Sequence, residues 1–300
     1  MALQPNELRA TPTYGITLWP VLSLLPVISA CTTVPLAQTG SLSSYERLQP
    51  ADSQFNGRKS RVRADKDAIL AARTVLIAPT TFSQSASEAK LSEKDKKLVA
   101  NAVDRSVCIG LSDRFHIVLP PQTADLTVHV SIASIVPTDE TAAATSKVLD
   151  IGKSVLTNTG TIETSVPIPS VRVPIGLGGI ALEGEAIDSF GQQKAAMLWA
   201  KGANSFFGTT RVSPVGDAYE LAASFGDDFS ELLVTGDNPF RTKMPSLPAM
   251  HRLKSMFGAA PKEAVCDAFG RKGVTDMLAG KFGLPPGWTD KGAQGDPQAR

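Results

Sequence analysis

The sequence predicts an α+β fold: a mixed or antiparallel sheet of about five strands with helices packed on one face, plus a small C-terminal helical extension. Three observations predict it. Residues 125–136 alternate apolar and polar side chains, as a strand with one buried face does. Residues 92–111 carry apolar side chains at helical spacing. Residues 179–203 form two strand-like runs around a turn at residues 189–192, which predicts a hairpin.

Two further strands and a second long helix complete the predicted domain. An apolar run at residues 74–79 ends in Pro79 and predicts a strand inside the sheet, and residues 116–119 predict another. Ser92, with Asp95 three positions later, forms a capping box that starts the first helix. A closing helix is expected from Ser213 or Pro214 to Val234, because its apolar residues fall on one face.

The chain divides into four predicted segments: a lipoprotein signal peptide at 1–30, a flexible tether at 31–66, a single α+β domain at 67–240 and a C-terminal extension at 241–300. The tether is predicted from its content of Ser, Gln, Pro and Gly. It ends in a basic cluster without interleaved aromatic residues, which predicts a solvated stretch rather than a binding patch. The cluster consists of Arg58, Lys59, Arg61, Arg63 and Lys66.

The N-terminus carries the most specific signal. An apolar run from Ile16 to Ile28 is too short to span a bilayer as a helix. The residues Ile-Ser-Ala-Cys follow at 28–31 and resemble the lipobox of bacterial lipoproteins. We therefore expect cleavage before Cys31 and lipidation of its thiol, since several acyl chains, at about 0.8 kcal/mol per buried CH₂, anchor a protein durably. Thr32 stands where an inner-membrane retention signal usually has Asp, which favours the periplasmic face of the outer membrane over the inner membrane.

Cys108 and Cys266 remain once Cys31 is lipidated, and an even pair in an exported protein is a candidate disulfide. At 100° per residue, Cys108 falls away from the apolar stripe of its predicted helix. We therefore expect the C-terminal piece that contains Cys266 to pack across this helix, with the two cysteines bridged or close to it.

Charge and residue content give little support for catalysis or nucleic-acid binding. The net charge is +1, which gives no global reason to expect a nucleic-acid partner. The three histidines, His116, His129 and His251, stand in no catalytic signature, and no catalytic residue, metal site or cofactor is predicted. Glu183 and Glu185 share one strand face, and alternation predicts that face to be solvent-exposed.

Three short motifs resemble a known family. They are Thr-Gly-Ser-Leu-Ser-Ser-Tyr at 39–45, Ala-Asp-Leu-Thr-Val at 124–128 and Gly-Gly-Ile-Ala-Leu-Glu-Gly-Glu-Ala at 178–186. Together they resemble the bacterial lipoproteins of the domain-of-unknown-function family 3313, over roughly residues 31–240. The resemblance implies no catalytic residue that carries over to this chain. By analogy of element order alone, the chain is also similar to small periplasmic lipoproteins that assist envelope transporters and secretion pores.

A proline-interrupted apolar stretch is the candidate partner-binding segment, because it offers apolar side chains on backbone that cannot pair fully in a sheet. Its apolar residues are Val166, Ile168, Val171, Val173 and Ile175. The alternative is that this stretch crosses the domain's own core. Two functions therefore stay open: a non-enzymatic, membrane-anchored accessory component of an envelope complex, or a periplasmic small-ligand-binding protein or hydrolytic enzyme. A deep polar pocket favours the second.

Overall fold

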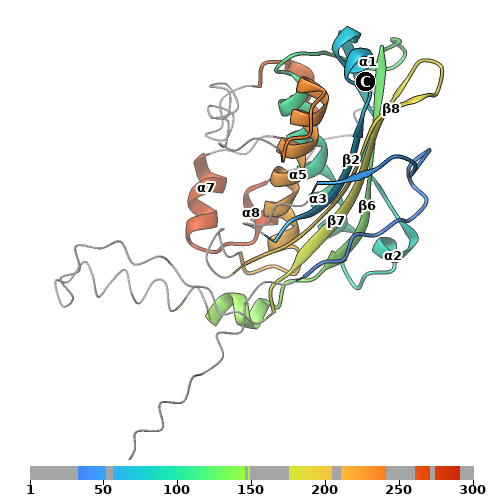
Figure 1. The fold of residues 1–300 in the computed structure, drawn as a ribbon. Helices are drawn as coiled ribbons and strands as arrows, with labels where there is room; N and C mark the ends of the chain where they lie inside the picture. Colours follow the sequence, from blue (N-terminus) through green and yellow to red (C-terminus); the bar gives the residue numbers. More distant parts are fainter. Residues whose placement is uncertain are drawn as a thin grey trace, which may run out of the picture.

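The computed structural model describes residues 33–51, 57–145, 148, 176–204, 211–240, 261–270 and 274–290. Within these ranges eight strands form one mixed sheet in the order β1-β2-β8-β7-β6-β3-β5, with β4 paired to β6 (Figure 1). The strands are β1 (Gln49–Pro50), β2 (Lys59–Ala64), β3 (Thr74–Ile77), β4 (Thr81–Phe82), β5 (His116–Val118), β6 (Leu126–Val136), β7 (Gly179–Asp188) and β8 (Gln193–Gly202).

The centre of the sheet is antiparallel and one side of it is parallel. Strands β6, β7, β8, β2 and β1 pair antiparallel in turn, and the predicted hairpin is β7 with β8. Strand β3 lies parallel to both β5 and β6. Because a parallel pair needs a crossover, the chain passes from β3 to β5 through a long helix, α3 (Glu93–Leu111).

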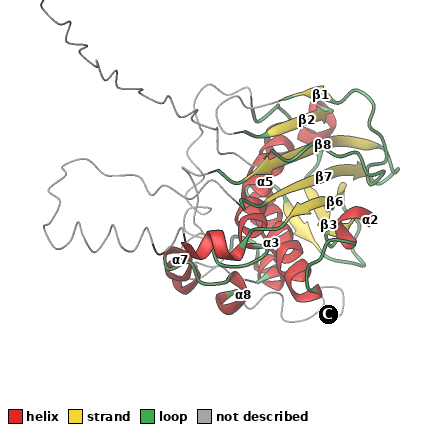
Figure 2. Ribbon diagram, turned by 90° about the horizontal axis from the view of Figure 1, so that it is seen from below, coloured by secondary structure: helices red, strands yellow, loops and turns green. Residues whose placement is uncertain are grey.

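Two long helices cover one face of the sheet, as Figure 2 shows. Helix α3 starts at its predicted cap, where Ser92 Oγ accepts a hydrogen bond from the Asp95 backbone N–H at 3.1 Å, and ends at the predicted Leu111. Helix α5 (Gly216–Thr235) lies beside it and starts slightly later than predicted. Shorter helices are α1 (Lys66–Ala71), α2 (Gln84–Ser87), the 3₁₀ turn η1 (Ala264–Phe269), α7 (Val274–Lys281) and α8 (Pro286–Thr289), and residues 140–145 are also helical.

Aromatic side chains fill the core between sheet and helices. The ring centroid of Trp199 on β8 lies 5.9 Å from that of Phe225, which stacks on Phe229 at 5.4 Å. All three side chains are fully buried. Gly184 on β7 leaves the room they need, since a Cβ at this position would lie 3.0 Å from Phe229 Cζ.

The predicted α+β class is confirmed, but the sheet has about eight strands rather than five. Part of the difference comes from β2, which lies inside the predicted tether and pairs with β8 over six residues. The tether prediction is therefore wrong for the described residues between 33 and 66. Basic side chains hid the strand pattern, because exposed Lys59 and Arg61 alternate with buried Ser60 and Val62.

The basic cluster is also not simply solvated. Arg58 forms an ion pair with Asp228 of α5 at 2.5 Å, and Arg63 donates to Gln193 of β8 at 3.0 Å. Lys66 reaches Asp237 at 2.6 Å, with both side chains largely exposed. Two of these basic residues thus connect β2 to its neighbours in the fold.

Candidate functional site

Two of the three family-like motifs, 39–45 and 178–186, meet on the face of the sheet opposite the helices. Glu183 and Glu185 point from β7 to this face, since Leu182, Gly184 and Ala186 point to the helices. The chain segment of residues 33–48 crosses over them and packs Val34, Leu42 and Leu48 onto the sheet. Motif residues 39–45 therefore lie on motif residues 178–186, although about 140 positions separate them in sequence.

Glu183 is held by the N-terminal segment. Its Oε1 accepts from the Thr39 backbone N–H at 2.8 Å, and its Oε2 accepts from the Tyr45 hydroxyl at 2.8 Å and the Thr39 hydroxyl at 3.0 Å. The backbone N–H of Ser41 adds a longer bond to Oε2 at 3.2 Å. Burial raises the pKa of the Tyr45 phenol, as does its bond to Glu183, so Tyr45 remains a donor at neutral pH.

Glu185 is held in the same way. Its Oε2 accepts from the backbone N–H of Ser43 at 2.8 Å, the Ser43 hydroxyl at 2.7 Å and the Gln193 side-chain amide at 2.7 Å. Ser41 also donates to Ser131 of β6, at 3.1 Å. We call this set of contacts the carboxylate latch: Glu183 and Glu185 with their donors in residues 39–45 and Gln193.

The expectation that Glu183 and Glu185 face solvent is wrong. Glu183 is 1% exposed and Glu185 5% exposed. Alternation had identified their face correctly, but it carries no information about a distant chain segment that covers that face. Because the latch directs backbone and hydroxyl donors at both carboxylates, its geometry is suited to holding the N-terminal segment rather than to acid–base chemistry on an outside molecule.

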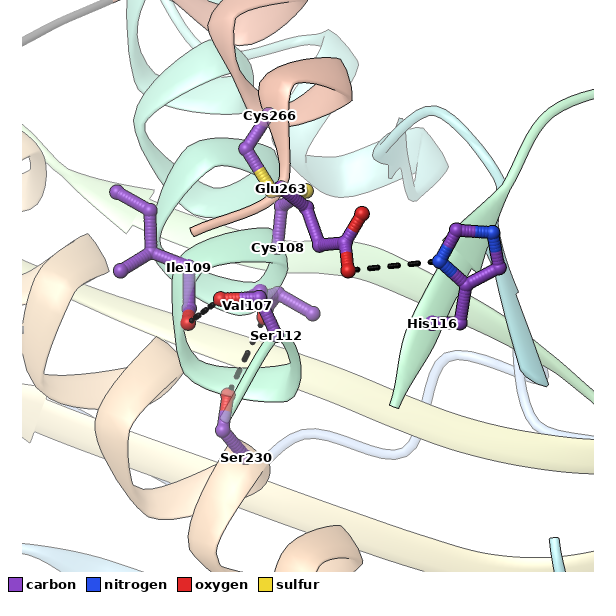
Figure 3. Close-up of a disulfide and its surroundings, with 8 residues drawn as sticks. All are labelled: Val107, Cys108, Ile109, Ser112, His116, Ser230, Glu263 and Cys266. Atoms are coloured by element: carbon purple, nitrogen blue, oxygen red, sulfur yellow. Dashed lines mark hydrogen bonds and ion pairs between the residues drawn. A yellow bond between two sulfur atoms is a disulfide. The ribbon is translucent and has the colours of Figure 1, made fainter. Parts of the chain in front are cut away.

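On the helix side, a disulfide joins Cys108 of α3 to Cys266 of η1, with Cα atoms 5.6 Å apart. Figure 3 shows the link, together with the contact between Glu263 and His116 Nδ1 at 3.4 Å. Cys108 points away from the sheet, as its helical position predicted, yet it is fully buried. The C-terminal segment accounts for this, because η1 packs across α3.

Buried ion pairs hold the rest of the C-terminal segment to the helices. Arg211 pairs with Asp276 of α7 at 3.0 Å, and Arg105 of α3 pairs with Asp290 at 2.8 Å. The Tyr219 hydroxyl on α5 also donates to Asp290, at 2.6 Å. Burial raises the pKa of Tyr219 well above its ordinary value, although the Arg105 charge opposes this.

Another buried carboxyl, that of Asp104 on α3, contacts the link between β3 and β4. Asp104 accepts bonds from the Thr80 hydroxyl at 2.5 Å and from the Thr80 backbone N–H at 3.1 Å. Burial raises the pKa of Asp104 to about 7, against the opposing effect of these bonds. Asp104 is enclosed in the core, so its shifted pKa concerns stability rather than catalysis.

A cavity of about 500 Å³ lies between β2 and the end of α5. Its polar walls include Arg47, Arg63, Asp65 and Asp237. Three of these four side chains already have partners in the fold: Arg63 bonds to Gln193, Asp65 caps α1 and Asp237 pairs with Lys66. Across the described ranges, no group of His, Cys, Asp and Glu side chains is arranged to hold a metal ion.

The structure does not describe the remaining site residues that the sequence predicted. Cys31 and the candidate partner-binding residues of 166–175 lie outside the described ranges. Of the described residues on either side of that stretch, Asp139 and Gly176 are in contact, since the Asp139 backbone N–H donates to Gly176 O at 2.8 Å. No helix in the described ranges is both long and apolar enough to cross a membrane.

Sequence reasoning missed the carboxylate latch. The signal was present in two of the three family-like motifs, which together supply Thr39, Ser41, Ser43 and Tyr45 as donors and Glu183 and Glu185 as acceptors. One sequence alone gives no pairing between them. The contact was decided by the path of residues 33–48 over the sheet.

Comparison with solved structures finds distant likenesses, two of which are forms of one protein. The chain is 10% identical to a PelC dodecamer from Paraburkholderia phytofirmans, with 59% of this chain and 96% of that chain covered and a TM-score of 0.32. A single-substitution variant of the same dodecamer is 13% identical, with 57% and 95% covered and a TM-score of 0.29. Among curated proteins, none matches the chain.

A family model matches residues 37–229, which is more than half of the chain and includes all three motifs and the carboxylate latch. The chain belongs to the family described as protein of unknown function (DUF3313).

Proposed function

We propose that this protein is a lipid-anchored periplasmic lipoprotein that acts without catalysis, as an accessory component of an envelope complex. Its anchor is Cys31, and its membrane is the outer membrane rather than the inner one. The observation that carries the proposal is the junction between residues 31 and 34.

The start of the folded domain supports the anchor. Val34 is buried on the sheet, three residues after Cys31, which would be the first residue of the cleaved chain. A lipobox-like sequence at 28–31 therefore stands directly before the domain, where a cut frees a complete fold with an N-terminal cysteine. A lipobox-like sequence inside a buried helix would have no such relation to the domain boundary.

The disulfide supports the compartment. A bond between Cys108 and Cys266 persists in oxidising surroundings such as the periplasm and is uncommon in reducing cytosol. It closes a loop across 158 positions, and chain entropy alone gives such a link up to about 5 kcal/mol of stabilisation.

The carboxylate latch supports a role without catalysis. The two carboxylates that the sequence offered for acid–base work accept hydrogen bonds from residues 39–45. Catalytic acids and bases need a substrate proton within hydrogen-bond reach, and here the chain's own donors occupy that position. Action through contacts with other proteins is the function that remains best supported.

Cys31→Ser tests the anchor. Cells that express it and are grown with radiolabelled palmitate should show loss of label from the protein and accumulation of the uncleaved precursor. The matched control is Cys108→Ser with Cys266→Ser, which removes the other two cysteines and should keep the label. Undiminished labelling of Cys31→Ser contradicts the proposal.

Crosslinking in native membranes tests the accessory role. The lipidated protein should migrate in one assembly of defined size with other envelope proteins. The comparison is the same chain exported without lipid, behind a signal peptide that lacks a lipobox. A lipidated protein that stays monomeric after crosslinking contradicts the accessory role and leaves the anchor intact.

A further inference from the structure

We infer that the C-terminal segment of residues 278–288 lies against the membrane and inserts its exposed apolar side chains into the lipid interface. The inference rests on the proposed lipidation of Cys31. It adds which face of the domain meets the membrane and which side chains make contact there.

The first step is the position of the anchor on the fold. Val34 lies so close above Gly179 that a Cβ on Gly179 would be 2.4 Å from Val34 Cγ2. Three residues of extended chain reach about 11 Å, so Cys31 lies within that distance of Val34. We call this end of the sheet the proximal end; it is formed by Val34 with the paired strand ends Val136, Gly179 and Gly202.

The second step connects the C-terminal segment to the proximal end. The Gly178 backbone N–H donates to Asp217 Oδ2, in the first turn of α5, at 2.7 Å. Just before α5, the Val212 backbone N–H donates to Gly283 O at 2.9 Å. Gly283 lies in the turn between α7 and α8. The proximal end is therefore connected to this turn through the start of α5, by one hydrogen bond on each side of it. Helices α7 and α8 appear beside the long helices in Figure 2.

The third step is the concentration of exposed apolar side chains in residues 278–288, which hold four of the seven large exposed apolar side chains in the described ranges. Asp276 is 2% exposed and Asp290 is also buried, where they pair with arginines. Phe282 is 65% exposed and Trp288 72% exposed, and Leu278 and Leu284 are exposed beside them in sequence. Lys281 is exposed among them. Large apolar side chains that are exposed together mark a contact with lipid or protein, so this segment fits partly apolar surroundings.

The fourth step is the choice of a lipid occupant. Leu278 lies in α7 and Phe282 directly follows its last residue, and the Phe282 backbone N–H donates to Leu278 O. Trp and Phe beside leucines are typical of helices that lie in a membrane interface. A lipid anchor close to the proximal end brings such an interface to this segment without any further partner.

Tryptophan fluorescence tests the inference. After cleavage before Cys31, the chain keeps two tryptophans, buried Trp199 and exposed Trp288. The lipidated protein is reconstituted in vesicles of phosphatidylethanolamine and phosphatidylglycerol with brominated acyl chains. We expect the brominated lipid to quench the fluorescence of Trp288. In Trp288→Phe, the remaining fluorescence of Trp199 should not be quenched by this lipid.

The matched control moves the probe to the other end of the sheet. Phe190, in the β7–β8 turn, is 86% exposed. In the Trp288→Phe background, Phe190→Trp should be quenched by aqueous acrylamide and not by brominated lipid.

Three outcomes overturn the inference. In the first outcome, acrylamide quenches Trp288 in the vesicle-bound protein, which means that Trp288 faces water. Trp288 shielded from both quenchers is covered by protein. Protein that does not float with the vesicles has no working anchor, and this result overturns the proposed function as well, whereas the first two leave it standing.

Discussion

The two faces of the sheet are covered by different kinds of chemistry. On one face α3 and α5 pack through aromatic and aliphatic side chains around Trp199. On the other, residues 33–48 have no helix and are held largely by hydrogen bonds to Glu183 and Glu185, with small apolar clusters at the sides. The first cover is apolar, and the second depends on hydrogen bonds.

This difference shows how the polar side of an alternating strand can still be buried. Along β7, Leu182 and Ala186 face the helices and Glu183 and Glu185 face the N-terminal segment. Burial of a carboxylate requires that donors compensate for lost water, and residues 39–45 supply them. The two faces therefore differ in what each should lose when a single side chain is removed.

The largest effect is expected on the apolar face. Phe225→Ala should lower the free energy of unfolding by about 3–5 kcal/mol, because it opens a cavity between Trp199 and Phe229. Chemical denaturation with the disulfide intact measures it. Phe190→Ala, in the exposed turn, is the control and should change stability by less than about 0.5 kcal/mol. An equal loss of unfolding free energy in both variants would show that the aromatic core does not cause the loss in Phe225→Ala.

A pH-dependent effect is expected from Asp104, the buried carboxyl of the helix side. Its pKa rises from 3.8 to about 7 on folding. Between these two pH values the folded protein therefore keeps a proton on Asp104 that the unfolded chain has released. The contribution of Asp104 to the free energy of unfolding is therefore fully present below about pH 4. It is lost as the pH rises through about 7, and the loss is up to about 4 kcal/mol.

Asp104→Asn should remove this dependence, since an amide keeps an acceptor for Thr80 and does not ionise. The difference in unfolding free energy between variant and wild type should grow from pH 4 to pH 8 in favour of the variant. The control is Asp67→Asn, which removes a carboxylate at an exposed position. A difference for Asp104→Asn that stays constant from pH 4 to pH 8 would argue against burial as the cause.

The smallest effect is expected on the hydrogen-bonded face. Glu183→Ala removes the acceptor of Thr39 and Tyr45, and should cost about 1–3 kcal/mol, because water can replace part of the lost bonds in this partly buried segment. Residues 39–45 should then exchange their amide hydrogens faster while α3 and α5 keep their protection. Glu46→Ala, an exposed glutamate in the same segment, is the control. Unchanged exchange in Glu183→Ala would mean that the apolar contacts hold the segment alone.

Elements with a strong local signal were predicted closely. The capping box at Ser92 gave the start of α3, and the alternation of residues 126–136 gave β6. The pairing of Leu182 with Trp199 and of Ala186 with Ala195 agrees with the hairpin predicted at residues 179–203. These features depend on a few neighbouring residues, which is why one sequence suffices for them.

The sequence by itself determined the fold class, the two long helices and the central strands, because period and capping are local properties. Only the tertiary structure decided that β2 joins the sheet, since its buried Ser60 and Val62 alternate with exposed Lys59 and Arg61 in a stretch rich in basic residues. It also decided that Glu183 and Glu185 are buried, since their donors come from residues about 140 positions away. The exposure of a side chain depends on which chain segment packs over it. For these two carboxylates that segment is distant in sequence, so only the path of the whole chain brings it there.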